Sequence, residues 1–313
     1  MKTSDILARL SAALNAANNF GNPVQIAKWR LLRKPSDPIT VVDKASGVRC
    51  QCSLDSHHMF SEVWYAHVYD VMGVPIRPGD VVLDIGANQG FFTCYAAYKG
   101  AKVFAFEPVP ELFERLVFNV KQNGFTDRVT TVQCAIGEND SRVAMLVSTP
   151  LGGGQSSIMP EFSRNHGIPL KRTINVRCKT LSQVLAEYSI SSVRRCKIDV
   201  EGAELEILRI LKPHEIAKFQ SIAMEYHFGV YPMVELIGML EAWSTHHISL
   251  MENDSTMGTY CGAWRTVFCS LDENLLSSIT NSWFSPRSWK LKSSKSWEKA
   301  AVSLLFCRAG WSL

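Results

Sequence analysis

Two carboxylates alternate with apolar residues in the segment Lys197-Ile-Asp-Val-Glu-Gly-Ala-Glu204. Asp199 and Glu201 stand at the end of a strand-like run, and Gly202 allows a sharp turn into the next helix. Ligands bind outside the carboxyl ends of parallel strands, where such carboxylates can attract a sulfonium, orient its ammonium group or accept a proton. The helix dipole alone explains Glu204 and part of Glu201, but it does not explain Asp199 inside the strand.

A histidine is expected at the same edge of the sheet. His227 ends the segment Met224-Glu-Tyr-His227 after the following strand, and an imidazole accepts protons near neutral pH. A purely structural histidine is equally compatible with this position. Asp199, Glu201 and His227 are therefore unranked candidates for a general base. The clustered carboxylates are compatible with a divalent metal, but no spaced His/Asp pattern argues for one, so no metal ligand is predicted.

A glycine loop is the strongest local signal in the chain. Asp84-Ile-Gly-Ala-Asn-Gln-Gly90 follows one strand-like run and opens a helix, whose free N–H groups can bind a carboxylate or phosphate. The spacing is Gly-x-x-x-Gly rather than the Gly-x-Gly-x-x-Gly of dinucleotide sites. It suits the amino-acid end of S-adenosylmethionine better, because Asp84 can attract the ammonium and the loop amides the carboxylate. The alternative is a tight turn without a ligand.

Two further positions fit a nucleoside. Glu107 ends the second strand-like run, 23 residues after Asp84, and a carboxylate there can accept hydrogen bonds from both ribose hydroxyls. Pro108 then ends the strand. Cys134-Ala-Ile-Gly137 leaves the third strand where an adenine ring would lie, and the small side chain of Ala135 leaves room for it. A surface glutamate and an ordinary strand exit are the alternatives.

Alternating strands and helices must position these residues. Short apolar runs predict seven strands, and helical spacing separates the first five, which implies right-handed βαβ units and a doubly wound α/β sheet. The last two strands form an antiparallel hairpin. The predicted strands are residues 81–85, 102–107, 129–136, 195–200, 221–226, 247–251 and 264–270, and the helices are residues 89–99, 111–123, 203–211 and 233–243. Residues 143–147 and 174–178 alternate like an edge hairpin.

The chain divides into three predicted parts, which are an N-terminal cap (1–78), a methyl-donor domain (79–271) and a C-terminal extension (272–313). The cap contains a helix at 3–18, a hairpin of 39–42 with 48–54, and a helix at 60–71. Residues 55–70 and 150–172 are expected to cover the donor and shape the acceptor pocket. From Pro286 onward the extension has six basic residues and one acidic residue, and it holds four of the eight tryptophans. It is either a solvated flank packed on the sheet or a surface for an acceptor or partner.

Composition excludes several classes of protein. The 313 residues are 46% hydrophobic and 20% charged, which is an ordinary globular mix and not that of a disordered or fibrous chain. The net charge of +4 is too small for a dedicated nucleic-acid binder. No apolar run reaches the ~20 residues of a membrane span, and the N-terminus does not resemble a signal peptide. The nine cysteines lack paired Cys-x-x-Cys spacing, so reduced thiols in a cytoplasm are expected.

The sequence resembles the FkbM-type methyltransferases over roughly residues 39–228. The resemblance lies in the glycine loop, Phe106-Glu-Pro108, Ala135-Ile-Gly137 and above all the Lys197–Glu204 run. It implies a class I methyltransferase that uses S-adenosylmethionine to O-methylate a hydroxyl of a sugar or secondary metabolite. Cys134 stands where many class I enzymes carry an acid for the adenine amino group. The expected donor-binding residues are Asp84, Gly86, Ala87, Asn88, Gly90, Phe91, Glu107, Pro108, Cys134, Ala135 and Asp199.

Three other readings remain open. A methyltransferase for RNA or another macromolecule would use the basic tail, but the amino-methylating Asn/Asp-Pro-Pro-Tyr motif is missing from the sequence. The glycine spacing disfavours a nicotinamide-dependent oxidoreductase. A non-catalytic binding module on the same fold is the third reading. The expected partner is a small hydroxylated acceptor such as a glycoside, nucleic acid is disfavoured, and the oligomeric state is left open.

Overall fold

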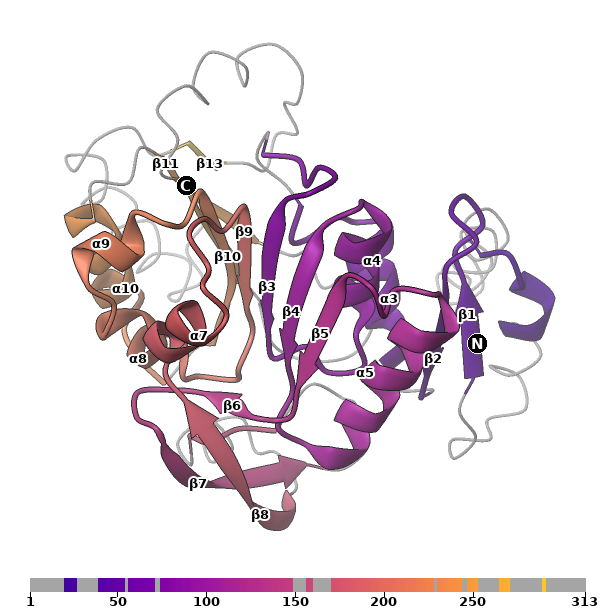
Figure 1. Ribbon diagram of the computed structural model, residues 1–313, viewed down its shortest axis with the longest axis horizontal. Coiled ribbons are helices and arrows are strands. Elements are labelled where there is room, and N and C mark those ends of the chain that lie inside the picture. Colours follow the sequence, from indigo (N-terminus) through magenta and orange to yellow (C-terminus); the bar gives the residue numbers. More distant parts are fainter. Residues whose placement is uncertain are drawn as a thin grey trace, which may run out of the picture.

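A twisted sheet with helices on both faces forms the centre of the molecule (Figure 1). The computed structural model describes residues 20–26, 39–53, 56–70, 74–148, 156–159, 170–227, 230–243, 247–252, 265–270 and 289–290. The predicted helix at 3–18 lies outside these residues, as does the extension apart from residues 289–290.

The main sheet contains eight strands in the order β13-β11-β12-β10-β9-β3-β4-β5. The run from β10 to β5 is parallel, whereas β12 lies antiparallel between β10 and β11. The seven predicted strands are all present, and a two-residue strand in the extension adds the eighth. The bounds are β3 Val81–Ile85, β4 Lys102–Phe106, β5 Val129–Val132, β9 Arg195–Ile198, β10 Ser221–Tyr226, β11 His247–Glu252, β12 Arg265–Ser270 and β13 Trp289–Lys290.

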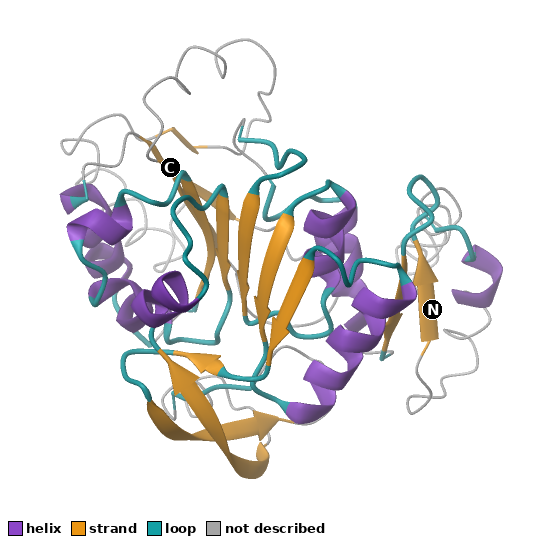
Figure 2. Ribbon diagram, in the orientation of Figure 1, coloured by secondary structure: helices purple, strands orange, loops and turns teal. Residues whose placement is uncertain are grey.

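Two hydrophobic cores lie on opposite faces of this sheet. Successive strand residues point to opposite faces, so Val82 packs in one core and Leu83 in the other. The first core is covered by α3 His57–Trp64, α4 Phe91–Tyr98 and α5 Pro110–Gln122. The second is covered by α7 Leu181–Glu187, α8 Glu204–Arg209, α9 Pro213–Ile216 and α10 Met233–Ala242 (Figure 2). Burial on both faces explains why the strands are continuous apolar runs.

Two predicted elements need correction, and one helix was not predicted. Residues 129–136 are not one strand, because the chain turns where the Cys134 N–H donates to the Val132 carbonyl and continues as β6 Ala135–Ile136 in another sheet. The helix predicted at 60–71 ends at Trp64, and His67 then adopts a positive φ. Helix α7 was not predicted, although Thr180 and Gln183 form the capping box that starts it.

A three-stranded sheet extends beyond one end of the main sheet (Figure 1). Its order is β6-β8-β7, with β7 at Ser141–Ser148 and β8 at Leu170–Lys179. The antiparallel pairing of β7 with β8 confirms the hairpin predicted from residues 143–147 and 174–178. Strand β6 joins β8 in parallel, which brings the exit from the third predicted strand against this smaller sheet.

The N-terminal hairpin packs on α5. It consists of β1 Ile39–Val42 and β2 Arg49–Cys52, as predicted. The Asn119 amide accepts from the Gln51 N–H and donates to the Gln51 carbonyl, at 2.7 and 2.9 Å. Phe20 and Phe60 belong to the same core as helix α4. The described part of the cap therefore shares its hydrophobic core with the sheet.

The described residues also answer two questions raised by composition. None of their helices has the length and apolar character needed to cross a bilayer. Six of their cysteines carry free, buried thiols, at positions 50, 52, 94, 134, 178 and 196.

Candidate active site

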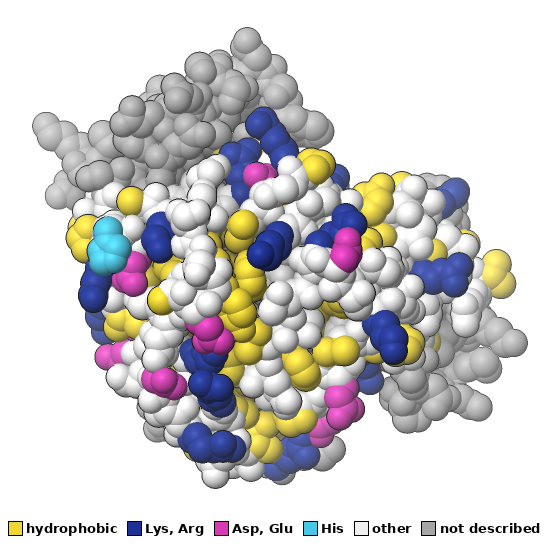
Figure 3. Space-filling view, viewed as in Figure 1, with side chains coloured by type: hydrophobic (Ala, Val, Ile, Leu, Met, Phe, Trp, Pro, Cys, Tyr) yellow, Lys and Arg dark blue, Asp and Glu magenta, His cyan; other side chains and the backbone are white. Residues whose placement is uncertain are grey.

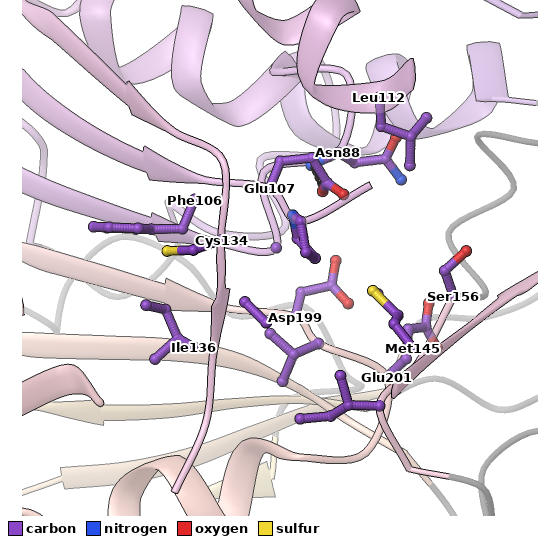
Figure 4. Close-up of a pocket in the computed structure, with 15 residues that line it drawn as sticks. Asn88, Phe106, Glu107, Leu112, Cys134, Ile136, Met145, Ser156, Asp199 and Glu201 are labelled. Atoms are coloured by element: carbon purple, nitrogen blue, oxygen red, sulfur yellow. Dashed lines mark hydrogen bonds between the residues drawn. The ribbon is translucent and has the colours of Figure 1, made fainter. Parts of the chain in front are cut away.

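A cavity opens where β3, β4 and β9 end and β6 begins (Figure 4). Its empty volume is about 610 Å³, part of it open to solvent. Figure 4 shows Phe106 and Cys134 on one side and Met145 and Ser156 on the other. The lining residues are Gly86, Asn88, Phe106, Glu107, Pro108, Leu112, Cys134, Ala135, Ile136, Met145, Ser156, Ile158, Asp199, Val200 and Glu201.

The glycine loop is fixed by backbone contacts. The N–H groups of Gly86 and Ala87 both donate to the Phe106 carbonyl, at 3.1 and 2.9 Å. Gly86 has a φ of 76°, and a Cβ on it would lie 1.8 Å from the carbonyl oxygen of Asp199. Only glycine allows this approach between the loop after β3 and the loop after β9. Gly90 takes a φ of 84° and caps helix α4.

Glu107 presents a partly satisfied carboxylate to the cavity. Its Oε2 accepts from the Asn88 N–H at 2.8 Å and its Oε1 from the Val109 N–H at 2.9 Å. Each carboxylate oxygen has two lone-pair positions, so each can accept one more hydrogen bond. The side chain is buried, and this burial raises the pKa of Glu107 to about 7 against the opposing effect of the two N–H donors. The arrangement suits a ligand with two adjacent hydroxyl groups.

Lys197 connects the glycine loop to the acidic motif. This role was not predicted from the sequence. Its Nζ lies 3.3 Å from Asp84 Oδ1 and 3.4 Å from Asp199 Oδ2, and it donates to the Gly86 carbonyl at 2.5 Å. Burial opposes the charge, but Asp199 and Asp84 raise the pKa of Lys197. The i, i+2 spacing of Lys197 and Asp199 along the strand was the available signal.

Asp199 is held as an anion in the cavity wall. Burial acts to raise its pKa, but Lys197 and His227 keep it below the ordinary value. The Tyr69 hydroxyl donates to Asp199 Oδ2 at 3.1 Å, so the segment after α3 reaches the site. Glu225 also bonds to Asp199, and burial and the Asp199 charge raise the pKa of Glu225 well above the ordinary value.

His227 lies between two glutamates. Its Nε2 is 3.1 Å from Glu201 Oε2, and its Nδ1 is 2.7 Å from Glu204 Oε1. Burial acts to lower the pKa of His227, but Glu204 and Glu201 raise it well above the ordinary value. Burial raises the pKa of Glu201 to about 7. One ligand atom each of Asp199, Glu201 and His227 lies within 4.8 Å of the others.

The structure separates the predicted donor-binding residues and base candidates into two groups. Eight candidates line the cavity: Gly86, Asn88, Glu107, Pro108, Cys134, Ala135, Asp199 and Glu201. Five others are not among its lining residues: Asp84, Ala87, Gly90, Phe91 and His227.

In the second group, Asp84 and Phe91 contact neighbouring buried side chains instead of the cavity. Asp84 is fully buried and accepts from the Thr93 hydroxyl at 2.6 Å in addition to its contact with Lys197. Phe91 packs edge-on against Phe60 in the core. These side chains hold the glycine loop in place rather than facing the cavity.

The side of the cavity near β6 is apolar. Cys134 is buried there, and burial raises the pKa of its thiol to about 11, so the side chain stays neutral near pH 7. Phe106 and Ile136 complete this side. Such a surface suits the faces of a flat aromatic ring better than a charged group.

Part of the predicted covering segment reaches the cavity. Ser156 and Ile158 line it, and the Ser157 hydroxyl donates to the Glu201 carbonyl at 2.6 Å. Ser157 also pairs with Leu146 of β7. Residues 149–155 and 160–169 lie outside the described part of the chain.

The fold and the position of the cavity define a class I methyltransferase. Its sheet has the order β11-β12-β10-β9-β3-β4-β5, with the antiparallel strand β12 beside β10, and the cavity lies at the carboxyl ends of the parallel strands. The model of the "Methyltransferase FkbM domain" matches residues 84–254. The chain therefore belongs to the FkbM methyltransferase family, as the resemblance predicted.

Named relatives are similar to this chain over part of its length. The chain is 26% identical over 210 residues to the 31-O-demethyl-FK506 methyltransferase FkbM of Streptomyces tacrolimicus, covering 59% of this chain and 80% of that protein. It is 28% identical over 155 residues to the hexuronic acid methyltransferase AglP of Haloferax volcanii, covering 49% and 58%. The solved FkbM methyltransferase of Methylobacillus flagellatus is 15% identical, with a TM-score of 0.44 over 85% of this chain and 60% of that one.

Proposed function

We propose that this methyltransferase uses S-adenosylmethionine to O-methylate a hydroxyl group of a sugar or secondary metabolite. The observation that carries the proposal is Glu107, whose two carboxylate oxygens each keep one acceptor position on the cavity. When bound, S-adenosylmethionine supplies a methyl group on a positively charged sulfur. Two relatives are named as a 31-O-demethyl-FK506 methyltransferase and a hexuronic acid methyltransferase, which supports a sugar or secondary metabolite as the acceptor.

The residues of the cavity fit this donor. Glu107 would accept hydrogen bonds from the two ribose hydroxyls, and the apolar side formed by Phe106, Cys134 and Ala135 would take the adenine. The loop that includes Gly86 and Asn88 lies against the amino-acid end. The tight contact between Gly86 and the Asp199 carbonyl keeps this loop free of side-chain bulk where the donor must approach.

The acidic cluster activates the acceptor. Asp199 and Glu201 line the cavity, so a hydroxyl placed beside them can lose its proton toward these carboxylates as the new C–O bond forms. The carboxylates also attract the positive sulfur. Alignment of the two reactants contributes up to ~7–11 kcal/mol to the lowering of the barrier in favourable systems. His227 acts through Glu201, which it contacts, because it does not line the cavity itself.

A small acceptor agrees with the visible surface. On the face in Figure 3, basic and acidic side chains are interspersed over the described residues. A macromolecular substrate such as RNA would be favoured by a continuous basic stripe.

Transfer of a labelled methyl group tests the reaction type. Glycosides and hydroxylated metabolites are incubated with methyl-labelled S-adenosylmethionine, each beside an analogue in which the hydroxyl is replaced by hydrogen. We expect labelled methyl ethers from the hydroxylated compounds only. Label on nitrogen or carbon, or equal labelling of the deoxy analogue, would overturn the O-methylation proposal.

A further inference from the structure

Three potential metal ligands converge beside the cavity. Asp199 and Glu201 follow strand β9, and His227 follows the neighbouring parallel strand β10. One ligand atom of each lies within 4.8 Å of the other two. Ligands around one ion at about 2.1–2.3 Å are separated by roughly 3–4.5 Å, so small side-chain movements bring these three atoms to coordination distance.

The histidine is oriented as metal-bound histidines are. Glu204 is fully buried, and its carboxylate accepts from the Gly202 N–H and the Tyr231 hydroxyl, both at 3.1 Å. Because Glu204 is thus an acceptor, the contact at 2.7 Å requires His227 Nδ1 to carry a proton. The other ring nitrogen, Nε2, then faces Glu201. A carboxylate that fixes a histidine through its second nitrogen is a common support of protein metal sites.

The charge balance also favours a cation. Four carboxylates gather in this buried region, at Asp84, Asp199, Glu201 and Glu204. Among the described residues, their ion-pair partners are Lys197 and, when protonated, His227. The four carboxylates therefore outnumber these two basic partners. A divalent ion would offset the excess of acidic groups where burial makes uncompensated charge costly.

We propose that Asp199, Glu201 and His227 bind one divalent cation of the Mn²⁺ or Mg²⁺ class at the acceptor side of the cavity. Two carboxylate oxygens and one imidazole nitrogen suit Mn²⁺ best among the common ions, with Mg²⁺ as the alternative. Glu204 acts as a positioning residue for His227.

The ion gives the cluster a definite role, which rests on the proposed function. A hydroxyl oxygen bound to the cation has a lowered pKa and loses its proton to solvent water before it attacks the methyl group. With the ion bound, Asp199, Glu201 and His227 are its ligands, and solvent water replaces the two carboxylates as the acceptor of the hydroxyl proton. This explains why three groups that each resemble a base occur together.

Titration with Mn²⁺, followed by electron paramagnetic resonance, tests the site without an acceptor or a donor. Chelator-treated protein of all 313 residues should bind one Mn²⁺ per chain. Each bound ion no longer contributes to the signal of aqueous Mn²⁺. We expect Asp199→Asn, Glu201→Gln and His227→Gln each to weaken binding at least about tenfold, and Glu204→Gln about 10–100-fold. Glu215→Gln and His214→Gln, which change the same residue types elsewhere, should bind as the wild type does.

Two outcomes would overturn the site. The first is no saturable Mn²⁺ binding by the wild type, a result that needs no variant to fold. The second is unchanged affinity in all three ligand variants whose thermal unfolding shows a folded chain. Binding of S-adenosylhomocysteine, measured in parallel, separates this proposal from the proposed function. Glu107→Gln should lose that binding but keep its Mn²⁺.

Discussion

A Cβ atom on Gly86 would lie only 1.8 Å from the carbonyl oxygen of Asp199. This contact fixes the distance between the glycine loop after β3 and the acidic motif after β9. The two strands are neighbours in the sheet, and the Asp199 N–H donates to the Ile85 carbonyl at 3.1 Å. The glycine loop and the acidic motif are therefore held together as one unit at the backbone level.

Replacement of Gly86 by alanine should damage this unit. Gly86→Ala combines a positive φ with a backbone collision, so a loss of about 2–4 kcal/mol in the free energy of unfolding is expected. Gly47→Ala is the matched control, because Gly47 has a φ of 73° and open space around a Cβ. It should lose only about 1 kcal/mol. Urea unfolding measures both, and equal losses would refute the contact.

Lys197 should be essential for stability. Lys197→Met leaves Asp84 and Asp199 buried beside an apolar side chain, and removing one partner of a buried ion pair typically costs about 3–5 kcal/mol. Arg209→Met removes a partner of the half-exposed pair with Glu235, which should cost less than about 1 kcal/mol. Denaturant unfolding of the two variants checks the difference. A Lys197→Met protein as stable as Arg209→Met would contradict the network.

Binding of S-adenosylhomocysteine should strengthen with pH through neutrality. In the proposed binding mode the ribose hydroxyls donate to Glu107, so the ionised carboxylate is the binding form. Because the pKa of Glu107 is raised to about 7, its ionised fraction rises about tenfold between pH 6 and pH 8, and affinity should rise by a similar factor. Glu107→Gln should show weak binding without this rise. Calorimetry at several pH values measures it, and a wild-type affinity that falls with pH would be contrary evidence.

The Ser157 hydroxyl should anchor the described part of the covering segment. Ser157→Ala leaves the buried Glu201 carbonyl without that donor, and an unsatisfied buried acceptor costs about 1–3 kcal/mol. Ser192→Ala changes an exposed serine that accepts from Gln220, and it should have little effect. Thermal unfolding compares the two. Equal stability of both variants would show that the bond to Glu201 contributes nothing.

Periodicity and turn residues predicted most of the central sheet. The strand Val81–Ile85 is continuously apolar apart from Asp84. Burial of the strand on both faces and a special role for the aspartate could therefore both be predicted from the sequence. The pairing of the last two strands was also predicted. The split after Val132 was not, because the pairing of Ala135 with Cys178 is a long-range contact that no local pattern encodes.

The sequence predicted which residues gather at the candidate site, but not which of their side chains point into the cavity. Asp84 and Asp199 both follow from their motifs, yet only Asp199 lines the cavity, whereas Asp84 turns toward Thr93 and Lys197. Tyr69 reaches Asp199 from 130 residues away in the chain. Such contacts depend on how the elements pack, so the sequence could indicate which residues gather but not which ones face the ligand.

Calorimetric binding of S-adenosylhomocysteine is the most direct test of the proposed donor site. We predict saturable 1:1 binding that NAD does not displace. Glu107→Gln should weaken it at least about tenfold, because hydrogen bonds to a charged group contribute about 1.5–3 kcal/mol. Glu111→Gln, on the same loop-to-helix segment but outside the cavity lining, should bind normally. No binding by the wild type, or displacement by NAD, would contradict the account.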